Sequence, residues 1–159
     1  MHGPCYLRLS RPATPVVCPE DYHFKIGKAA VFRQGTDVTL AATGIMVAPA
    51  LEAAEKLAQE SISARVVNVA TLKPFDGQVI TQCAQETGAI VTAEEHLKHG
   101  GLGSIVAEVL GESCPVPMSI LAIEDVYTHS GEAEELLELR GLTANRIADR
   151  AREVIKRKQ

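Results

Sequence analysis

The chain has 159 residues, of which 46% are hydrophobic and 23% are charged, and its formal net charge is −4 at pH 7. This length fits one well-formed core, and the composition is that of an ordinary globular domain. The negative charge gives no general attraction to nucleic acids or anionic membranes, and no apolar run approaches the roughly 18 residues of a membrane span.

The first elements expected along the chain are a short strand and a linker. CYLRL (5–9) is predicted to be a strand. SRPATPVVCPEDYHF (10–24) is rich in proline and is therefore predicted to be an extended linker. A strand followed by a long linker is typical of the end of one domain joined to the start of another.

From Ala29 onward the pattern becomes regular. AAVFRQ (29–34) and VTLAAT (38–43) flank the turn signal GTD, and together they predict an antiparallel hairpin. A helix is expected at 46–60, because the apolar residues there recur at helical spacing on one face.

The rest of the chain is predicted to alternate strands with helices. Strands are expected at 64–69, 89–94 and 119–123, and helices at 76–86, in the second half of 93–110, at 131–139 and at 143–157. Thr143 is the expected N-cap of the last helix. This order predicts a mainly parallel sheet covered on both faces, to which the hairpin adds one antiparallel strand.

The four cysteines are widely spaced and include no C-x-x-C pair, so they suggest neither a zinc knuckle nor a disulfide framework. The N-terminal residues contain no apolar segment of the kind found in signal peptides. We therefore expect a soluble protein with reduced thiols, located in the cytoplasm.

The stretch AEEHLKHGGLGSIVAEVL (93–110) raises the question of a metal site. Glu94, Glu95, His96 and His99 offer suitable ligand atoms. However, an H-x-x-H pair on a loop lacks the helical i, i+4 spacing of H-E-x-x-H and so imposes no geometry on a metal. No metal site is predicted here.

The glycines of the same stretch could belong to a nucleotide site or to a structural turn. Gly101 and Gly103 are not followed by the third small residue of G-x-G-x-x-G, and no lysine completes a phosphate loop. The favoured interpretation is a turn that allows positive φ and close backbone approach where a helix begins. The backbone amides at the start of that helix could donate hydrogen bonds to a carboxylate or another anion from a neighbouring domain.

Several successive stretches together resemble the C-terminal portion of transketolase. They are YLRLSRP, FKIGKAAVFRQGTDVTLAATGIMVAPALEAAEKL, ARVVNVATLKPFD, AEEHLKHGGLGSIVAEVL and ELLELRGLTANRI, in family order from about Tyr6 to Arg152. The same domain ends deoxyxylulose phosphate synthase and the beta chains of 2-oxo-acid dehydrogenases. The resemblance implies a three-layer α/β/α domain with a five-stranded mixed sheet, one strand antiparallel. It assigns 1–24 to the end of a preceding pyrimidine-binding domain plus linker, and 25–159 to the C-terminal domain.

The resemblance also implies a parent reaction, the reversible transfer of a two-carbon ketol unit between sugar phosphates in the pentose phosphate pathway. That reaction uses thiamine diphosphate and a divalent metal such as Mg²⁺. The family's G-D-G motif for these groups is absent from this sequence, and the activating glutamate belongs to the middle domain. The chain alone is therefore expected to bind no cofactor and to be inactive. Its implied partner is the N-terminal, cofactor-binding section of transketolase, in a homo-dimer or hetero-oligomer.

One substrate-binding residue is implied by the resemblance, and no catalytic one. Arg11 in LSRP matches the family's arginine that contacts the terminal phosphate of the substrate, a task suited to a guanidinium fork. The alternative is a solvated linker arginine. Arg8, in the predicted strand at 5–9, matches no family role.

The family match gives no ligand role to the residues of the glycine-rich turn. We predict that they form a structural turn whose acidic residues and glycines face a neighbouring domain or another chain of the assembly: Glu94, Glu95, His96, Gly100, Gly101 and Gly103. A different class of function stays open, in which the fold is a stand-alone regulatory or small-molecule-binding module. Such a module would use the ATG (42–44) and GGLG (100–103) loops at the carboxyl edge of the sheet.

Overall fold

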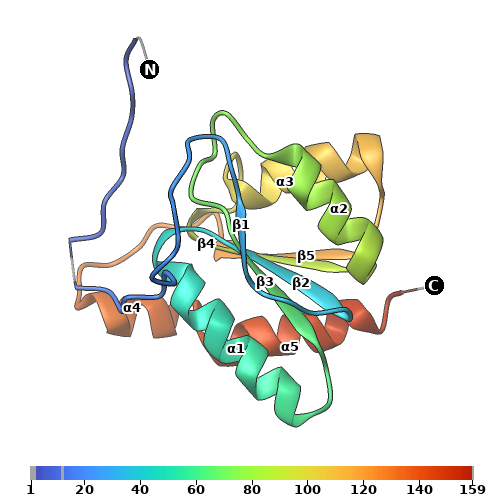
Figure 1. Cartoon of the computed structure of the whole chain (residues 1–159). Helices are drawn as coiled ribbons and strands as arrows, with labels where there is room; N and C mark the ends of the chain where they lie inside the picture. Colours follow the sequence, from blue (N-terminus) through green and yellow to red (C-terminus); the bar gives the residue numbers. More distant parts are fainter. Residues whose placement is uncertain (1–2, 12, 159) are drawn as a thin grey trace.

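A computed structural model describes residues 3–11 and 13–158 of the chain (Figure 1). Met1, His2, Pro12 and Gln159 lie outside the described residues. Pro12 is the last residue of the LSRP stretch, and of that stretch the structure describes only Leu9, Ser10 and Arg11. The elements are β1 (Ala30–Arg33), β2 (Val38–Ala42), η1 (Gly44–Met46), α1 (Val47–Gln59), β3 (Ala64–Asn68), α2 (Gly77–Thr87), β4 (Ile90–Leu97), α3 (Leu102–Ser113), β5 (Met118–Ile123), α4 (Ala133–Leu139) and α5 (Ala144–Ile155).

The strands form one five-stranded sheet in the order β1-β3-β2-β4-β5. β1 runs antiparallel to β3, and the other neighbouring pairs are parallel. Figure 1 shows α1 and α5 on one side of this sheet and α2 and α3 on the other. The expected three-layer fold with one antiparallel strand is therefore confirmed.

Two apolar cores lie on opposite faces of the sheet. The first joins β2, β3 and β4 to α1 and α5, with Leu57 and Ile147 among its fully buried side chains. The second joins the opposite strand face to α2 and α3, with Ile80 and Leu102 at its centre. Every residue of β2 is buried, as expected for a strand covered on both faces.

The predicted hairpin of 29–34 with 38–43 is wrong in its pairing. β1 and β2 are both hydrogen-bonded to β3, which lies between them. The intervening turn crosses the start of β3, where Thr36 N and Asp37 N both donate to Ser63 O. A Cβ on Gly35 would collide with the backbone at Ala64, so a glycine is required at this crossing.

The predicted strand at 5–9 is also wrong within this chain. Residues 5–9 are extended but belong to no strand, and Tyr6, Leu7 and Leu9 are 89%, 74% and 77% exposed. A strand needs a neighbour for its backbone donors and acceptors, and the described residues offer none at this position.

The predicted helix starts and ends are close to those observed. Thr143 caps α5 as expected, because its Oγ1 accepts a hydrogen bond from Arg146 N at 3.3 Å. β4 continues to Leu97, beyond its expected end at residue 94. Within 3–11 and 13–158, no helix combines the length and the apolar character needed to cross a membrane.

Candidate functional site

The carboxylate of Glu94 closes the turn between β4 and α3. The side chain is fully buried, and its two oxygens accept hydrogen bonds from Leu102 N at 2.6 Å and from Gly103 N at 2.8 Å. These amides belong to the first turn of α3, which has no internal acceptors for them and carries the positive end of the helix dipole. The anion site expected at this helix start is therefore filled by the chain itself.

The environment of Glu94 shifts its titration. Burial raises the pKa of the carboxyl above its ordinary value, while the hydrogen bonds from Gly103 and Leu102 act in the opposite direction. The net direction is upward. Glu94 is thus a buried acid whose ionised form is stabilised by the helix start and penalised by loss of water.

The glycines of the turn make room for this carboxylate. A Cβ on Gly101 would overlap the Glu94 carboxyl group, and Gly100 has φ +80, a conformation that favours glycine. A Cβ on Gly103 would lie 2.6 Å from Ile120 Cγ2, so α3 approaches β5 more closely here than any side chain would allow. These glycines let the chain pass close to the Glu94 carboxyl group and to β5.

Gly103→Val is expected to lower the free energy of unfolding by about 1–3 kcal/mol, because the new side chain has to displace Ile120. The measurement is the midpoint of urea unfolding. Gly111→Val in the same helix is the matched control, since a Cβ on Gly111 meets no atom within 4 Å. An unchanged midpoint for Gly103→Val would show that the close approach is not required.

Three residues predicted to face a neighbour lie inside the domain instead. Glu94 is buried under the start of α3, Gly101 against the Glu94 carboxyl group and Gly103 against Ile120 of β5, so this part of the prediction is wrong. His96 and Gly100 are exposed, and Glu95 is half-buried, so these positions can still contribute to a surface. Glu94 is buried because it lies on the same face of β4 as Thr92, and α3 covers this face.

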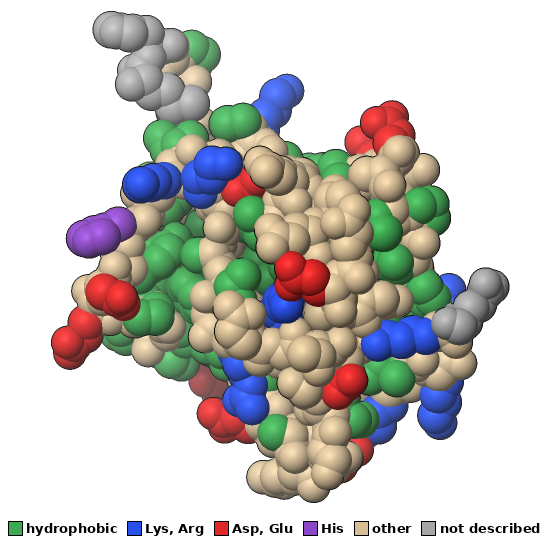
Figure 2. Space-filling model, turned by 45° about the vertical axis from the view of Figure 1, so that its right-hand side comes forward, with side chains coloured by type: hydrophobic (Ala, Val, Ile, Leu, Met, Phe, Trp, Pro, Cys, Tyr) green, Lys and Arg blue, Asp and Glu red, His purple; other side chains and the backbone are tan. Residues whose placement is uncertain are grey.

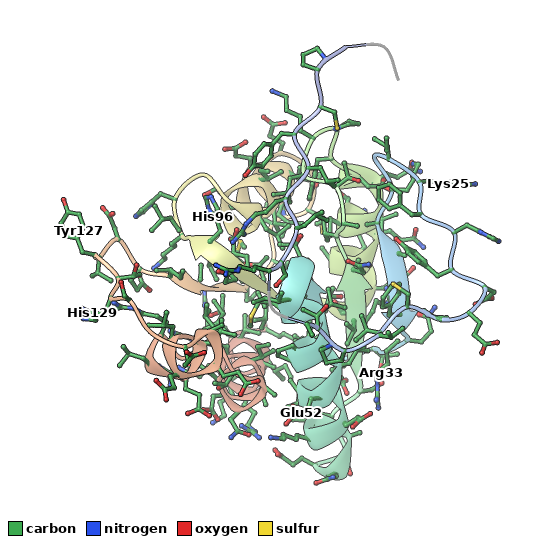
Figure 3. The ribbon with its side chains drawn as sticks, turned by 90° about the vertical axis from the view of Figure 1, so that its left-hand side faces the viewer. Lys25, Arg33, Glu52, His96, Tyr127 and His129 are labelled. Atoms are coloured by element: carbon green, nitrogen blue, oxygen red, sulfur yellow. The ribbon has the colours of Figure 1, made fainter. Side chains whose placement is uncertain are left out.

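The histidines of the stretch do not assemble a metal centre. Figure 3 labels His96, which is exposed and whose Nδ1 lies 2.9 Å from Leu97 O. His99 is exposed as well, and both oxygens of Glu94 are already engaged by α3. Among the residues that the structure describes, no three His, Cys, Asp or Glu side chains are grouped so that they could hold a metal ion.

The N-terminal segment contacts this turn through Arg8. Its Nη1 donates to Glu95 O at 2.8 Å and its Nη2 to Glu95 Oε2 at 2.7 Å. The two residues are 87 positions apart in the sequence, so no spacing rule could have paired them. This contact brings the 3–11 segment to the carboxyl end of β4.

Arg11 is exposed and lines a cavity of about 350 Å³. The cavity lies between the N-terminal segment and parts of η1, β5 and α4, and the residues lining it include Arg8, Ile45, Glu95, Ile123, Leu136 and Arg140. The structure thus places Arg11 beside the Arg8–Glu95 contact, with its guanidinium accessible from solvent.

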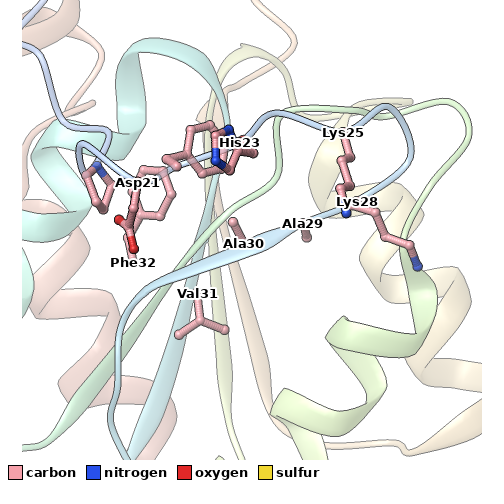
Figure 4. Close-up of a pocket in the computed structure, with 10 residues that line it drawn as sticks. Asp21, His23, Lys25, Lys28, Ala29, Ala30, Val31 and Phe32 are labelled. Carbon is pink, nitrogen blue, oxygen red and sulfur yellow. The ribbon is translucent and has the colours of Figure 1, made fainter.

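A second cavity, of about 410 Å³, lies under the linker before β1 (Figure 4). Asp21, His23, Lys25 and Lys28 line it from the linker, and Ala30 to Phe32 line it from β1. Neither Arg11 nor the β4–α3 turn contributes to it. No pattern in the sequence predicts a hollow here, and none of its side chains belongs to a predicted site.

The family model described as "Transketolase, C-terminal domain" matches residues 27–147. The chain belongs to the transketolase C-terminal domain family. The family resemblance stated from the sequence is therefore confirmed.

Two curated relatives that match nearly the whole chain are named as transketolase subunits. The chain is 49% identical over 156 residues to the 6-deoxy-6-sulfo-D-fructose transketolase subunit SqwH of Clostridium sp. (strain MSTE9), covering 98% of this chain and 48% of that protein. It is 40% identical to an apulose-4-phosphate transketolase subunit of Phocaeicola vulgatus, covering 97% of this chain and 49% of that protein. The chain thus spans about half the length of these relatives.

A solved structure gives the same result for the transketolase domain in three dimensions. The chain superimposes with a TM-score of 0.90 and 45% identity on a split gene transketolase in an inactive beta4 tetramer. The match covers 94% of this chain and 49% of that one. The fold and the family therefore agree.

Proposed function

We propose that this chain is the non-catalytic C-terminal section of a transketolase-type enzyme, acting together with a section that binds the cofactor. The observation that carries the proposal is the set of relatives that match nearly the whole chain and are themselves named transketolase subunits. The reaction would be ketol transfer between sugar phosphates, and the location would be the cytoplasm.

The N-terminal segment supports a partner in this assembly. Tyr6, Leu7 and Leu9 are exposed along an extended stretch that has no strand neighbour among the described residues. We assign 1–24 to the end of the preceding domain with its linker, and 25–159 to the C-terminal domain. In the view of Figure 2, hydrophobic side chains lie towards the left edge, and further ones are spread over the right side among charged residues.

The start of α3 does not fit the diphosphate of thiamine diphosphate. The amides at the start of α3, which could receive a diphosphate, are occupied by Glu94. The sequence has no G-D-G motif. We therefore place thiamine diphosphate and Mg²⁺ on the partner section of the assembled enzyme.

The contribution of this chain to substrate binding would come from Arg11. A guanidinium keeps its charge at all physiological pH values and offers paired donors to phosphate oxygens. Arg11 is exposed beside a cavity, so a phosphate could reach it.

The alternative of a stand-alone ligand-binding module is less well supported. It would rely on the GGLG amides at the start of α3, and the side chain of Glu94 already accepts hydrogen bonds from two amides there. An external anion would have to displace a buried carboxylate from its hydrogen bonds.

Co-purification from the source organism tests the proposal. A tagged chain is expected to retain a partner that carries a G-D-G motif, in a fixed ratio and through gel filtration. Recovery of the chain alone, as a folded species that binds no such partner, would contradict the proposal.

A further inference from the structure

The contact between Arg8 and Glu95 has the geometry of an anchor. Both terminal nitrogens of Arg8 donate to the same residue, one to its backbone oxygen at 2.8 Å and one to its carboxylate at 2.7 Å. Two charge-assisted hydrogen bonds to one residue fix the orientation of a guanidinium as well as its position. The family resemblance assigns no role to Arg8.

The partner of Arg8 is itself firmly held. Glu95 follows Glu94, whose carboxylate is buried on the first turn of α3, and both belong to β4. Beyond it, Leu97 pairs with Ile123 of β5, and Lys98 N donates to Ile123 O at 2.8 Å. Arg8 therefore ties the N-terminal segment to the carboxyl end of β4.

The segment that carries Arg11 is extended, and the Arg8–Glu95 contact is one of its attachments to the domain. Residues 5–9 make no strand ladder with the described part of the chain. Arg11 lies three positions after Arg8, so the two Cα atoms are at most about 11 Å apart. Arg8, Arg11 and Glu95 all line the cavity of about 350 Å³.

We propose that Glu95 is a positioning residue for substrate selectivity: by holding Arg8, it orients the segment that presents Arg11 to the phosphate of the substrate. This proposal rests on the proposed function of Arg11. Glu95 touches no substrate itself. The side chain of Glu95 acts through its hydrogen bond from Arg8 Nη2, while the bond from Arg8 Nη1 goes to the backbone oxygen, which Glu95→Ala keeps.

Glu95→Ala is expected to weaken the binding of phosphorylated acceptors less than Arg11→Ala does. The Arg8 and Glu95 side chains are 54% and 36% exposed, and solvent weakens an ion pair of that kind. In the assembled enzyme, Glu95→Ala is expected to raise KM for a phosphorylated acceptor about threefold to tenfold, with kcat changed much less. The change for a matched unphosphorylated acceptor is expected to stay within about twofold.

Two further variants separate positioning from a general structural effect. Glu95→Gln keeps both oxygen acceptors for Arg8 and should recover part of the lost selectivity. Glu124→Ala removes a similar exposed ion pair, that with Lys98 beside the same turn, and should leave selectivity unchanged. If Glu124→Ala lowers selectivity as much as Glu95→Ala, the positioning role is wrong.

A double-mutant cycle with Arg11→Ala completes the test. If Glu95 acts through Arg11, then Glu95→Ala has no further effect on selectivity in the Arg11→Ala background. An effect that persists undiminished there contradicts the proposal. If Arg11→Ala lowers selectivity and Glu95→Ala does not, the positioning role of Glu95 is contradicted and the phosphate-binding role of Arg11 is supported. If Arg11→Ala leaves selectivity unaltered, the proposed function of Arg11 falls as well.

Discussion

Glu94→Ala is expected to lower the free energy of unfolding by about 2–4 kcal/mol, because it leaves two buried amides of α3 without an acceptor. The amides are those of Leu102 and Gly103, which donate to the Glu94 carboxylate in the wild type. Urea unfolding followed by circular dichroism measures the change. Glu108→Ala removes an exposed glutamate from the same helix and should change stability by no more than about 0.5 kcal/mol. Equal stabilities of the two variants would contradict the capping role.

The pH dependence of stability independently measures how the folded state shifts the pKa of Glu94. Burial raises the pKa of Glu94, so the folded state holds this proton more tightly than the unfolded chain does. The part of the stability that comes from this raised pKa is therefore complete below about pH 4.3, the ordinary glutamate value, and is lost as the pH rises through the raised pKa, while the hydrogen bonds from the α3 amides to the carboxylate remain. Glu94→Gln does not titrate. The stability of the wild type relative to Glu94→Gln should fall over this range, and a rise would mean that the helix amides outweigh burial.

Arg11→Ala is expected to reduce kcat/KM for phosphorylated acceptors about tenfold to a hundredfold in the assembled enzyme. A charge-assisted contact to phosphate contributes about 1.5–3 kcal/mol, and it acts far from the reacting carbons. Most of the change should therefore appear in KM, with unphosphorylated acceptors affected much less. Steady-state kinetics with a matched pair of acceptors measures this difference.

Arg146→Ala is the control for the loss of one positive charge. Arg146 is exposed on α5 and does not line the cavity beside Arg11. It should leave the preference for phosphorylated acceptors unchanged. An unaltered preference in Arg11→Ala as well would remove Arg11 from the substrate site.

Most of the fold could be predicted from the local pattern of the sequence. The alternation of buried strands and amphipathic helices from Val38 to Ile155 reports local periodicity, and the structure follows it. The strand pairing of β1 could not be predicted in the same way. The turn signal near Gly35 indicates a chain reversal but does not reveal that β3 inserts between the two strands.

The candidate site was less predictable, because its contacts are tertiary. The glycines at 100, 101 and 103 indicated a tight turn, but the closing group is the side chain of Glu94, eight residues before Leu102. Its burial follows from the fact that α3 covers this face of β4, which only the assembled sheet shows. Arg8 and Glu95 are 87 positions apart in the sequence, and neither composition nor residue spacing predicts their contact.

Reconstitution of activity tests the central claim most directly. Ketol transfer is measured with this chain alone, with a partner that carries G-D-G and the activating glutamate, and with both, in the presence of thiamine diphosphate and Mg²⁺. The proposed function predicts turnover by the mixture and none by this chain alone. Turnover by this chain alone, or a mixture no more active than the partner by itself, would contradict it.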